Sequence, residues 1–314
     1  MKGFEKFKNY IWILPFTSGI CWGAAGIFVR TLIHDGLDNL TIIFFRMLFA
    51  SAILAVIIFF LDKSLLKIHL KDVGLFAVSG FLGLTMMNAL YNVAISEGSL
   101  ALASVLLALS PVFVLISATI VLHEMPTPRK IVCACFSLLG CVLVSGVLES
   151  GGLASTPKGI VCGLLSAVSY ACYGIVSKKI TRKHYHFLTI TLYTSLFSAI
   201  SLLPFAHIGK AVHILGNTSN HALMVLILHA VLTSVFPYGL YSLSMEYLEA
   251  GKVAILVSTE PASAMVIGIL CYGENPTILS ILGLCCTICS IILLNRPVRA
   301  HNSLQRSMNS SQQS

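Results

Sequence analysis

The sequence predicts an all-α membrane protein with ten transmembrane helices, arranged as two five-helix halves that enter the membrane in opposite directions. Three observations predict it: the composition, ten long apolar stretches and an internal repeat. Of the 314 residues, 57% are hydrophobic and 10% are charged, whereas a soluble domain has about 25% charged residues. A soluble fold could not hide this much apolar surface from water, but a lipid bilayer can act as its solvent.

The ten apolar stretches have the length of membrane-spanning helices, which need roughly 20 mostly apolar residues. Backbone polar groups at lipid depth must be satisfied within the segment, so each stretch is expected to be helical. We assign residues 11–148 to a first five-helix repeat, 159–295 to a second, and 296–314 to a disordered cytoplasmic tail. The predicted helices are 11–33, 40–61, 73–96, 100–122, 130–148, 159–177, 187–207, 222–246, 252–272 and 277–295.

The positive charges predict the orientation of these helices. Sixteen Lys and Arg residues fall on the side of the N-terminus, and only Arg30, Lys158 and Lys210 fall on the other. Because loops rich in Lys and Arg stay in the cytoplasm, we expect a multi-pass protein of the inner, cytoplasmic membrane with both termini in the cytoplasm. Orientation also explains the net charge of +8, so we expect no nucleic-acid partner.

The two halves align with each other. An offset of 148 places the motif that begins at Ser18 on the motif that begins at Ser166, and later motifs match at an offset of 150. Five helices are an odd number, so the second half is inverted, which suits alternating access, although a duplication can also build a stable scaffold. The pairs at offset 150 are Leu90-Tyr91 with Leu240-Tyr241, Pro111 with Pro261, and Glu124-x-Pro126-Thr127 with Glu274-x-Pro276-Thr277.

Two symmetry-related stripes are candidates for a cavity wall. Asn88, Tyr91 and Asn92 share one face of the third helix, and Tyr238 and Tyr241 repeat that face in the eighth. Aromatic faces can hold an apolar or cationic solute, and polar ends can orient it. The alternative is that these side chains join helices through hydrogen bonds.

Glu260 and Arg46 are charges at membrane depth, where a charge costs at least ~2.5–3.5 kcal/mol. Glu260 could be a proton-coupling carboxyl, an anchor for a substrate amine, or a structural hydrogen-bonded residue. Arg46 could pair with Glu260, bind a substrate carboxylate, or extend its side chain outward. Pro111 and Pro261 are candidate hinges, because proline frees a carbonyl one turn back.

Trp22 and Tyr170 are repeat mates near the middle of the first and sixth helices, where they flank the cavity or pack between helices. Glu124, which precedes a Pro-Thr pair, is expected to cap the helix that follows. The ten cysteines lie mostly in apolar runs, where they act as small apolar side chains. Histidines around the loop between the seventh and eighth helices, such as His207 and His229, lack ligand spacing, so we expect no metal site and no cofactor.

The residues that carry a family resemblance are Trp22-Gly23, Phe44-Phe45-Arg46 and the matching segments from Ser110-Pro111 to Thr127 and from Glu260-Pro261 to Thr277. Over about residues 11–295 the chain resembles the EamA-type family of the drug/metabolite transporter superfamily. The resemblance implies export of amino acids or other metabolites, or exchange of nucleotide-linked or phosphorylated solutes. It also implies a central cavity lined by helices from both halves.

These observations favour a secondary transporter of a small metabolite, most simply an amino acid or amino-acid-like solute. It would act by export or exchange, with protons or a counter-solute as the coupling partner. The alternatives are a membrane-embedded enzyme or a channel. Against an enzyme, the chain has no G-x-S-x-G, H-E-x-x-H or paired-carboxylate motif, and it has no Walker A motif for ATP. A channel would be expected to show a Gly-rich filter loop, which is also absent from the sequence.

Overall fold

The computed structural model describes residues 10–149, 156–217, 221–273 and 275–296. Glu274 and the expected tail beyond Arg296 lie outside the described residues. The first repeat contains α2 (Ile13–Gly23), α3 (Ala25–His34), α4 (Asn39–Leu61), η1 (Lys63–Leu66), η2 (Leu70–Asp72), α5 (Val73–Val78), η3 (Ser79–Thr85), α6 (Met86–Ser96), α7 (Leu100–Leu107), α8 (Ser110–Ser117), η4 (Ala118–Leu122) and α9 (Pro128–Val144). The second contains α10 (Pro157–Thr181), α11 (Phe187–Leu202), η5 (Leu203–Phe205), α12 (Ile208–Asn217), α13 (His221–Ala230), η6 (Val231–Val235), α14 (Phe236–Tyr247), α15 (Ala250–Val257), α16 (Glu260–Tyr272) and α17 (Ile278–Asn295).

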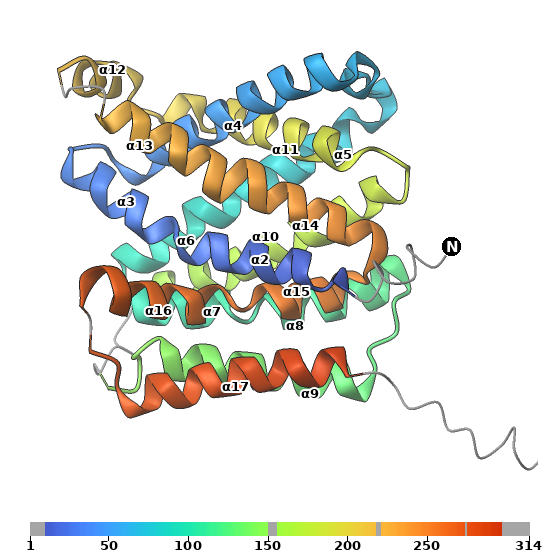
Figure 1. The fold of residues 1–314 in the computed structure, drawn as a ribbon, viewed down its shortest axis with the longest axis vertical. Helices are drawn as coiled ribbons and strands as arrows, with labels where there is room; N and C mark the ends of the chain where they lie inside the picture. The colour runs from blue at the N-terminus through green and yellow to red at the C-terminus, as the bar shows by residue number, and fades with distance from the viewer. Residues whose placement is uncertain (1–9, 150–155, 218–220, 274, 297–314) are drawn as a thin grey trace, which may run out of the picture.

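Among the described residues, nine helical stretches are long and apolar enough to cross a membrane. They correspond to nine of the ten expected helices, several of them built from two or three shorter elements in a row. The remaining expected helix is α9, which has 17 residues and is therefore shorter than the roughly 20 that a span needs. It lies beside α17 along one edge of the molecule (Figure 1). The expectation of ten helices is thus close to what the structure shows.

Both ends of the described chain lie at the same end of the molecule, where α2 begins and α17 finishes (Figure 1). We call this the terminal end, and we call the opposite one the far end. The far end holds the end of α3, the start of α4, the start of α7 and the end of α16. An even number of crossings places both ends of a chain on the same side, and α9 is the candidate for the tenth crossing beside the nine that are long enough.

The helix contacts are reciprocal between the halves. Helix α2 contacts α14 and α16, and its repeat mate α10 contacts the corresponding α6 and α8. Helix α4 contacts its own mate α11, and α9 contacts its own mate α17. A two-fold axis produces this pattern, because it copies each contact of one half into the other half. A helix that lies next to the axis contacts its own repeat mate.

Local backbone features also repeat at an offset of 150. The wide π-helical segments η3 and η6 fall at matching places, and so do the breaks between α7 and α8 and between α15 and α16. The fourth and ninth helices both end on a left-handed residue, His123 with φ 57° and Gly273 with φ 64°. Thr127 and Thr277 then cap the next helices, α9 and α17, through their side-chain oxygens. The duplication is therefore visible in the backbone as well as in the sequence.

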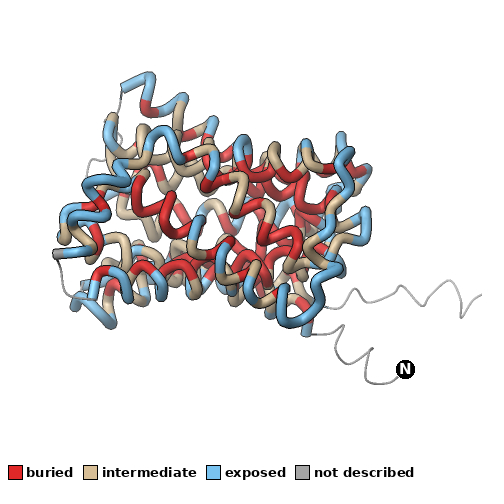
Figure 2. Tube along the Cα trace, turned by 90° about the horizontal axis from the view of Figure 1, so that it is seen from above, coloured by how far each residue is buried: buried red, intermediate tan, exposed pale blue. Residues whose placement is uncertain are grey.

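The outer surface of the bundle is apolar. Buried residues run through the middle of the molecule, while exposed ones lie around its outside (Figure 2). The exposed positions include Phe60, Ile120, Leu270 and Ile278, whose side chains are 69–81% exposed. Water would strongly disfavour so much apolar surface, whereas lipid accepts it.

Asp38 fixes the start of α4 at the far end. Its carboxylate accepts hydrogen bonds from Thr41 N at 3.0 Å and from Thr41 Oγ1 at 2.7 Å, and His207 Nδ1 lies 3.0 Å away. Partial burial by itself would raise the pKa of the Asp38 carboxyl, but the hydrogen bonds from Thr41 and His207 outweigh burial and lower this pKa.

Candidate functional site

A cavity of about 550 Å³ lies between the two halves. It reaches the far end, because its wall includes Asn39 at the start of α4, Leu100 at the start of α7 and Tyr272 at the end of α16. Most of the residues singled out in the sequence share this wall. They are Trp22, Arg46, Asn88, Tyr91, Asn92, Tyr170, Tyr238, Glu260 and Pro261.

Tyr241 and Pro111 are not part of this wall. Tyr241 is fully buried behind it, and its ring stacks on Tyr173 with centroids 5.2 Å apart. Pro111 is buried in the first turn of α8. The stripe expected on the eighth helix therefore divides, with Tyr238 on the cavity and Tyr241 one turn deeper.

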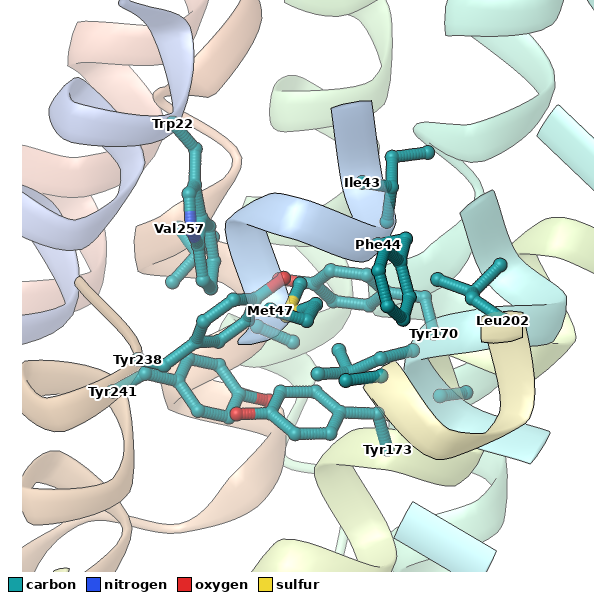
Figure 3. Close-up of a cluster of buried hydrophobic side chains, with 14 of the residues drawn as sticks. Trp22, Ile43, Phe44, Met47, Tyr170, Tyr173, Leu202, Tyr238, Tyr241 and Val257 are labelled. Atoms are coloured by element: carbon teal, nitrogen blue, oxygen red, sulfur yellow. The ribbon is translucent and has the colours of Figure 1, made fainter. Parts of the chain in front are cut away.

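Five aromatic side chains form one buried cluster, of which three line the cavity, and we call the cluster the aromatic floor: Trp22, Tyr170, Tyr173, Tyr238 and Tyr241 (Figure 3). Trp22 contacts Tyr238 at 4.9 Å and Tyr170 at 6.5 Å between ring centroids. Tyr173 was not singled out in the sequence, although it lies three residues after Tyr170 and so shares its helix face.

Trp22 also has a structural role. Pro237 has no backbone N–H to donate to the carbonyl four residues earlier, which belongs to Thr233. The indole Nε1 of Trp22 donates to that carbonyl at 3.0 Å. Trp22 therefore lines the cavity and also satisfies a backbone group that the π-helical segment η6 leaves open.

Arg46 is buried, with 7% of its surface exposed, rather than extended to the far-end surface. Among the described residues its guanidinium forms no ion pair with Glu260 within 4.0 Å, although the charge of Glu260 acts on it. Its Nε has no hydrogen-bond partner within the described part of the chain, and neither do Nδ2 of Asn92 and Oη of Tyr170 on the same wall. Buried polar atoms without partners are rare in proteins and call for an explanation.

The sequence suggested that Glu260 lies within a continuous helix, but the structure shows a break there. The ninth crossing breaks after Val257, and Glu260 opens the new helix α16. Its half-buried carboxylate therefore sits at a helix N-terminus, which favours negative charge. Gly19 and Gly23 of α2 make room for the break, since a Cβ at Gly19 would lie 2.7 Å from the carbonyl oxygen of Val257. That oxygen has no helical donor, because Pro261, four residues later, has no backbone N–H.

Asn88 and Tyr91 already have partners in the protein. Asn88 Nδ2 donates to the carbonyl of Leu84 at 2.7 Å. The hydroxyl of Tyr91 lies 2.9 Å from that of Ser104 on α7. Asn88 and Tyr91 therefore line the cavity, and Tyr91 also joins α6 to α7.

Polar contacts hold the terminal end together. Lys178 is buried, and its Nζ donates to the carbonyls of Met245 and, at 2.7 Å, Leu248. The carboxylate of Glu124 accepts from the backbone N of Ala250 at 2.9 Å and lies 3.4 Å from the guanidinium of Arg182. We call Lys178, Glu124 and Arg182 the terminal latch.

The terminal latch corrects one expectation from the sequence. Glu124 does not cap the helix that follows it, because Thr127 occupies that position and accepts from Lys130 N at 3.4 Å. Glu124 instead binds the first turn of α15, on the other half of the chain. The sequence could not show this, since the contact joins segments more than a hundred residues apart.

The histidines do not converge. His229 alone lines the cavity, His207 pairs with Asp38, and the described residues include no group of His, Cys, Asp and Glu that could hold a metal ion. His229 was considered in the sequence only as part of a histidine cluster. The signal available in the sequence was its position about two turns into the eighth crossing, within an apolar run.

Comparisons with known proteins agree on the family. The EamA-like transporter family matches twice, over residues 9–146 and 157–296. The chain is 28% identical over 274 residues to an uncharacterized transporter of Archaeoglobus fulgidus, covering 85% of this chain and 89% of the relative. It is 26% identical over 286 residues to the uncharacterized transporter YdfC of Bacillus subtilis, covering 87% and 90%.

A protein of known crystal structure shares the fold, with a TM-score of 0.74 and 14% identity over 90% of this chain and 95% of that one. At this identity the likeness concerns the fold alone. The two family matches together span nearly the whole chain and coincide with the two structural halves. The chain therefore belongs to the EamA-like transporter family and is a multi-pass membrane transporter.

Proposed function

We propose that this protein is a secondary transporter that moves a small carboxylate-bearing metabolite, with an amino acid or amino-acid-like solute favoured, across the cell membrane by alternating access. The observation that carries the proposal is the cavity between the halves, which reaches one end and has unpartnered buried polar atoms of Arg46, Asn92 and Tyr170 on its wall. A ligand with matching polar groups would satisfy them.

The chemistry of the wall favours a zwitterion. The guanidinium of Arg46 suits a carboxylate, which it can bind through two parallel hydrogen bonds. The carboxylate of Glu260 on the same wall suits an ammonium group, and the aromatic floor offers π faces to a cation or an apolar side chain. The volume of about 550 Å³ lies within the range of small-molecule sites.

The repeat supports alternating access. At the offset of 148, Lys178 corresponds to Arg30, and at the offset of 150, Met245 and Leu248 correspond to Ile95 and Gly98. In this structure the Arg30 guanidinium instead lies over the ring of Tyr272, 4.6 Å from its centroid, at the far-end mouth of the cavity. If the halves exchange conformations, Arg30 would bind the end of α6 as Lys178 now binds the end of α14.

The positive charges support placing the terminal end in the cytoplasm. The described cavity would then face the outside, as a transporter does when it releases an exported solute or takes up a counter-solute. Glu260 is the candidate coupling group, because it is the acidic residue on the cavity wall. Exchange without protons would use the same wall with Glu260 as an amine anchor only.

The test is flux into liposomes that contain the purified protein. Uptake of a labelled amino acid should saturate, should be stimulated by internal unlabelled solute, and should be inhibited by members of a panel of unlabelled metabolites. Replacing Glu260 with Gln should abolish proton-driven flux, while the matched variant Glu246→Gln, an exposed position on α14, should not.

Two results would argue against the proposal. Conversion of a solute without flux would favour a membrane enzyme, and uptake that does not saturate would favour a channel. If Glu260→Gln still transports with protons at the wild-type rate, Glu260 is not the coupling group. Its remaining roles would then be an anchor for the substrate amine or a structural group.

A further inference from the structure

His229 is a buried polar side chain on the cavity wall that has no role in the transport scheme above. It lies near the end of α13, two residues before the π-helical segment η6 begins, and is completely buried. Its ring stacks on Phe28 with centroids 5.2 Å apart. Its Nε2 atom has no hydrogen-bond partner among the residues that the structure describes.

The hydrogen bonds of Thr233 favour one of the two ring nitrogens of His229 as the carrier of the proton. Thr233 Oγ1 donates to the carbonyl oxygen of His229 at 2.7 Å, so its single proton is used. The same oxygen lies 3.0 Å from His229 Nδ1. With the hydroxyl proton on the shorter contact to the carbonyl, this oxygen accepts from Nδ1, and we assign the ring proton to Nδ1 on that basis. In the neutral ring, Nε2 is then a hydrogen-bond acceptor.

Arg46 lies close enough for its charge to act on His229, yet the two side chains do not bond each other. The wall therefore presents a donor, Arg46 Nε, and an acceptor, His229 Nε2, both buried and both unpartnered. A ligand that accepts from one and donates to the other would satisfy both atoms at once. A positively charged donor at Nε2 would be repelled by the guanidinium, so a neutral donor is favoured.

The equivalent pair in the other half behaves differently. At the offsets of the repeat, His229 corresponds to Ser79 and Arg46 to Thr194. These two small side chains bond each other directly, Thr194 Oγ1 to Ser79 Oγ at 3.3 Å. The fold is thus satisfied by a closed polar contact at this place, and packing alone does not require the larger, unpaired histidine and arginine.

We infer that His229 is a specificity-determining residue, whose Nε2 accepts a hydrogen bond from a hydroxyl or amide N–H of the substrate while Arg46 binds the substrate carboxylate. This inference rests on the proposed function and narrows its substrate class. It selects carboxylate solutes that carry a neutral hydrogen-bond donor over apolar solutes of the same shape, because an apolar group would leave Nε2 buried and unpaired.

The experiment compares matched solutes as competitors of uptake into liposomes that contain the full-length protein. L-threonine and L-valine have nearly the same shape, and so do L-asparagine and L-leucine. The wild-type protein should bind the polar member of each pair about tenfold more tightly, as one hydrogen bond to a buried group implies. His229→Phe should reduce that ratio to about one, and His229→Gln, which keeps an acceptor, should retain part of it.

His221→Gln is the matched control, since His221 is exposed at the start of the same helix and should leave the ratio unchanged. A wild-type ratio of one, or an unchanged ratio in a monodisperse His229→Phe protein, would overturn the inference. The wild-type measurement decides even if the variants do not fold. If both members of each pair compete equally, only the role of His229 fails, whereas if no solute of the panel enters or competes, the proposed function fails with it.

Discussion

Replacing Lys178 with Met should open the terminal end and close the far end. The change keeps much of the length of the side chain but removes the buried ammonium that donates to the carbonyls of Met245 and Leu248. These contacts exist only while α10 and α14 are held together at that end. Their loss therefore destabilises the described state relative to one in which the far end is closed.

The size of the effect follows from the contacts. A hydrogen bond with a charged partner contributes about 1.5–3 kcal/mol, and Lys178 makes two of them. Part of this is offset by the cost of burying the ammonium. A net loss of about 2 kcal/mol corresponds to an approximately 30-fold shift in the equilibrium between the two states.

Hydrogen–deuterium exchange measured by mass spectrometry can detect this shift. Amides at the end of α14 and the start of α15 should exchange faster in Lys178→Met than in the wild type, and amides at the end of α6 should exchange more slowly. Lys179→Met is the matched control, because Lys179 is the next residue of α10 and is exposed. Arg30→Met should shift both regions in the opposite direction.

The far end distinguishes a change of state from local fraying. If α14 and α15 exchange faster while the end of α6 is unchanged, Lys178 only caps a helix and the coupling between the two ends does not exist. The same conclusion follows if Lys179→Met has the effect of Lys178→Met. Either result would refute the use of the repeat to predict the second state.

Other variants test the packing and the far-end charges. Trp22→Phe keeps a ring but leaves a backbone carbonyl unpaired, so the free energy of unfolding should fall by about 1–2 kcal/mol; an unchanged thermal midpoint in detergent would contradict this. Gly140→Val should lower the free energy of unfolding by about 1–3 kcal/mol, since a Cβ there would lie 2.8 Å from the backbone of α17. Gly26→Ala meets open space and should not destabilise the protein. Equal thermal midpoints of the two variants would refute the close contact at Gly140. The lowered pKa of Asp38 means that its carboxylate stabilises the fold above the unfolded pKa, and this stabilisation is lost as the pH falls below about 4. In Asp38→Asn the free energy of unfolding should therefore fall less steeply as the pH decreases. A pH dependence identical to that of the wild type would contradict this role of Asp38.

The helices and the repeat could be predicted from the sequence because both leave a local pattern. Lipid exposure requires long apolar runs, and duplication leaves matched motifs at fixed offsets. The break before Glu260 was harder to see, because Pro261 marks a disturbance in the helix but does not show on which side of it the helix divides. In the structure the division falls before Glu260, where glycines of another helix leave space for it.

The site was predicted in outline, because polar residues within apolar runs stand out. Arg46, Asn92 and Glu260 do reach one cavity wall. What could not be predicted is the depth and rotation of each side chain, which depend on helix packing between distant segments. Tyr241 was expected on the wall beside Tyr238 and lies behind it, stacked on a tyrosine of α10.

The differences between the halves indicate where selectivity resides. Features that recur at the offset of 150 include the π-helical segments and the left-handed ends at His123 and Gly273. Under the proposed alternating access, they belong to the frame that both conformations would share. Of the charged wall residues, Arg46 and Glu260 do not recur, since they correspond to Thr194 and Ser110.

A substrate contact does not need to be copied, because a ligand near the centre of a two-fold arrangement meets each half with a different part of its surface. Selection can therefore diversify one half of the wall while the moving parts stay matched. On this argument, substitutions at positions where the halves differ should change which solute is carried. Substitutions at positions where they agree should instead change how readily the two states interconvert.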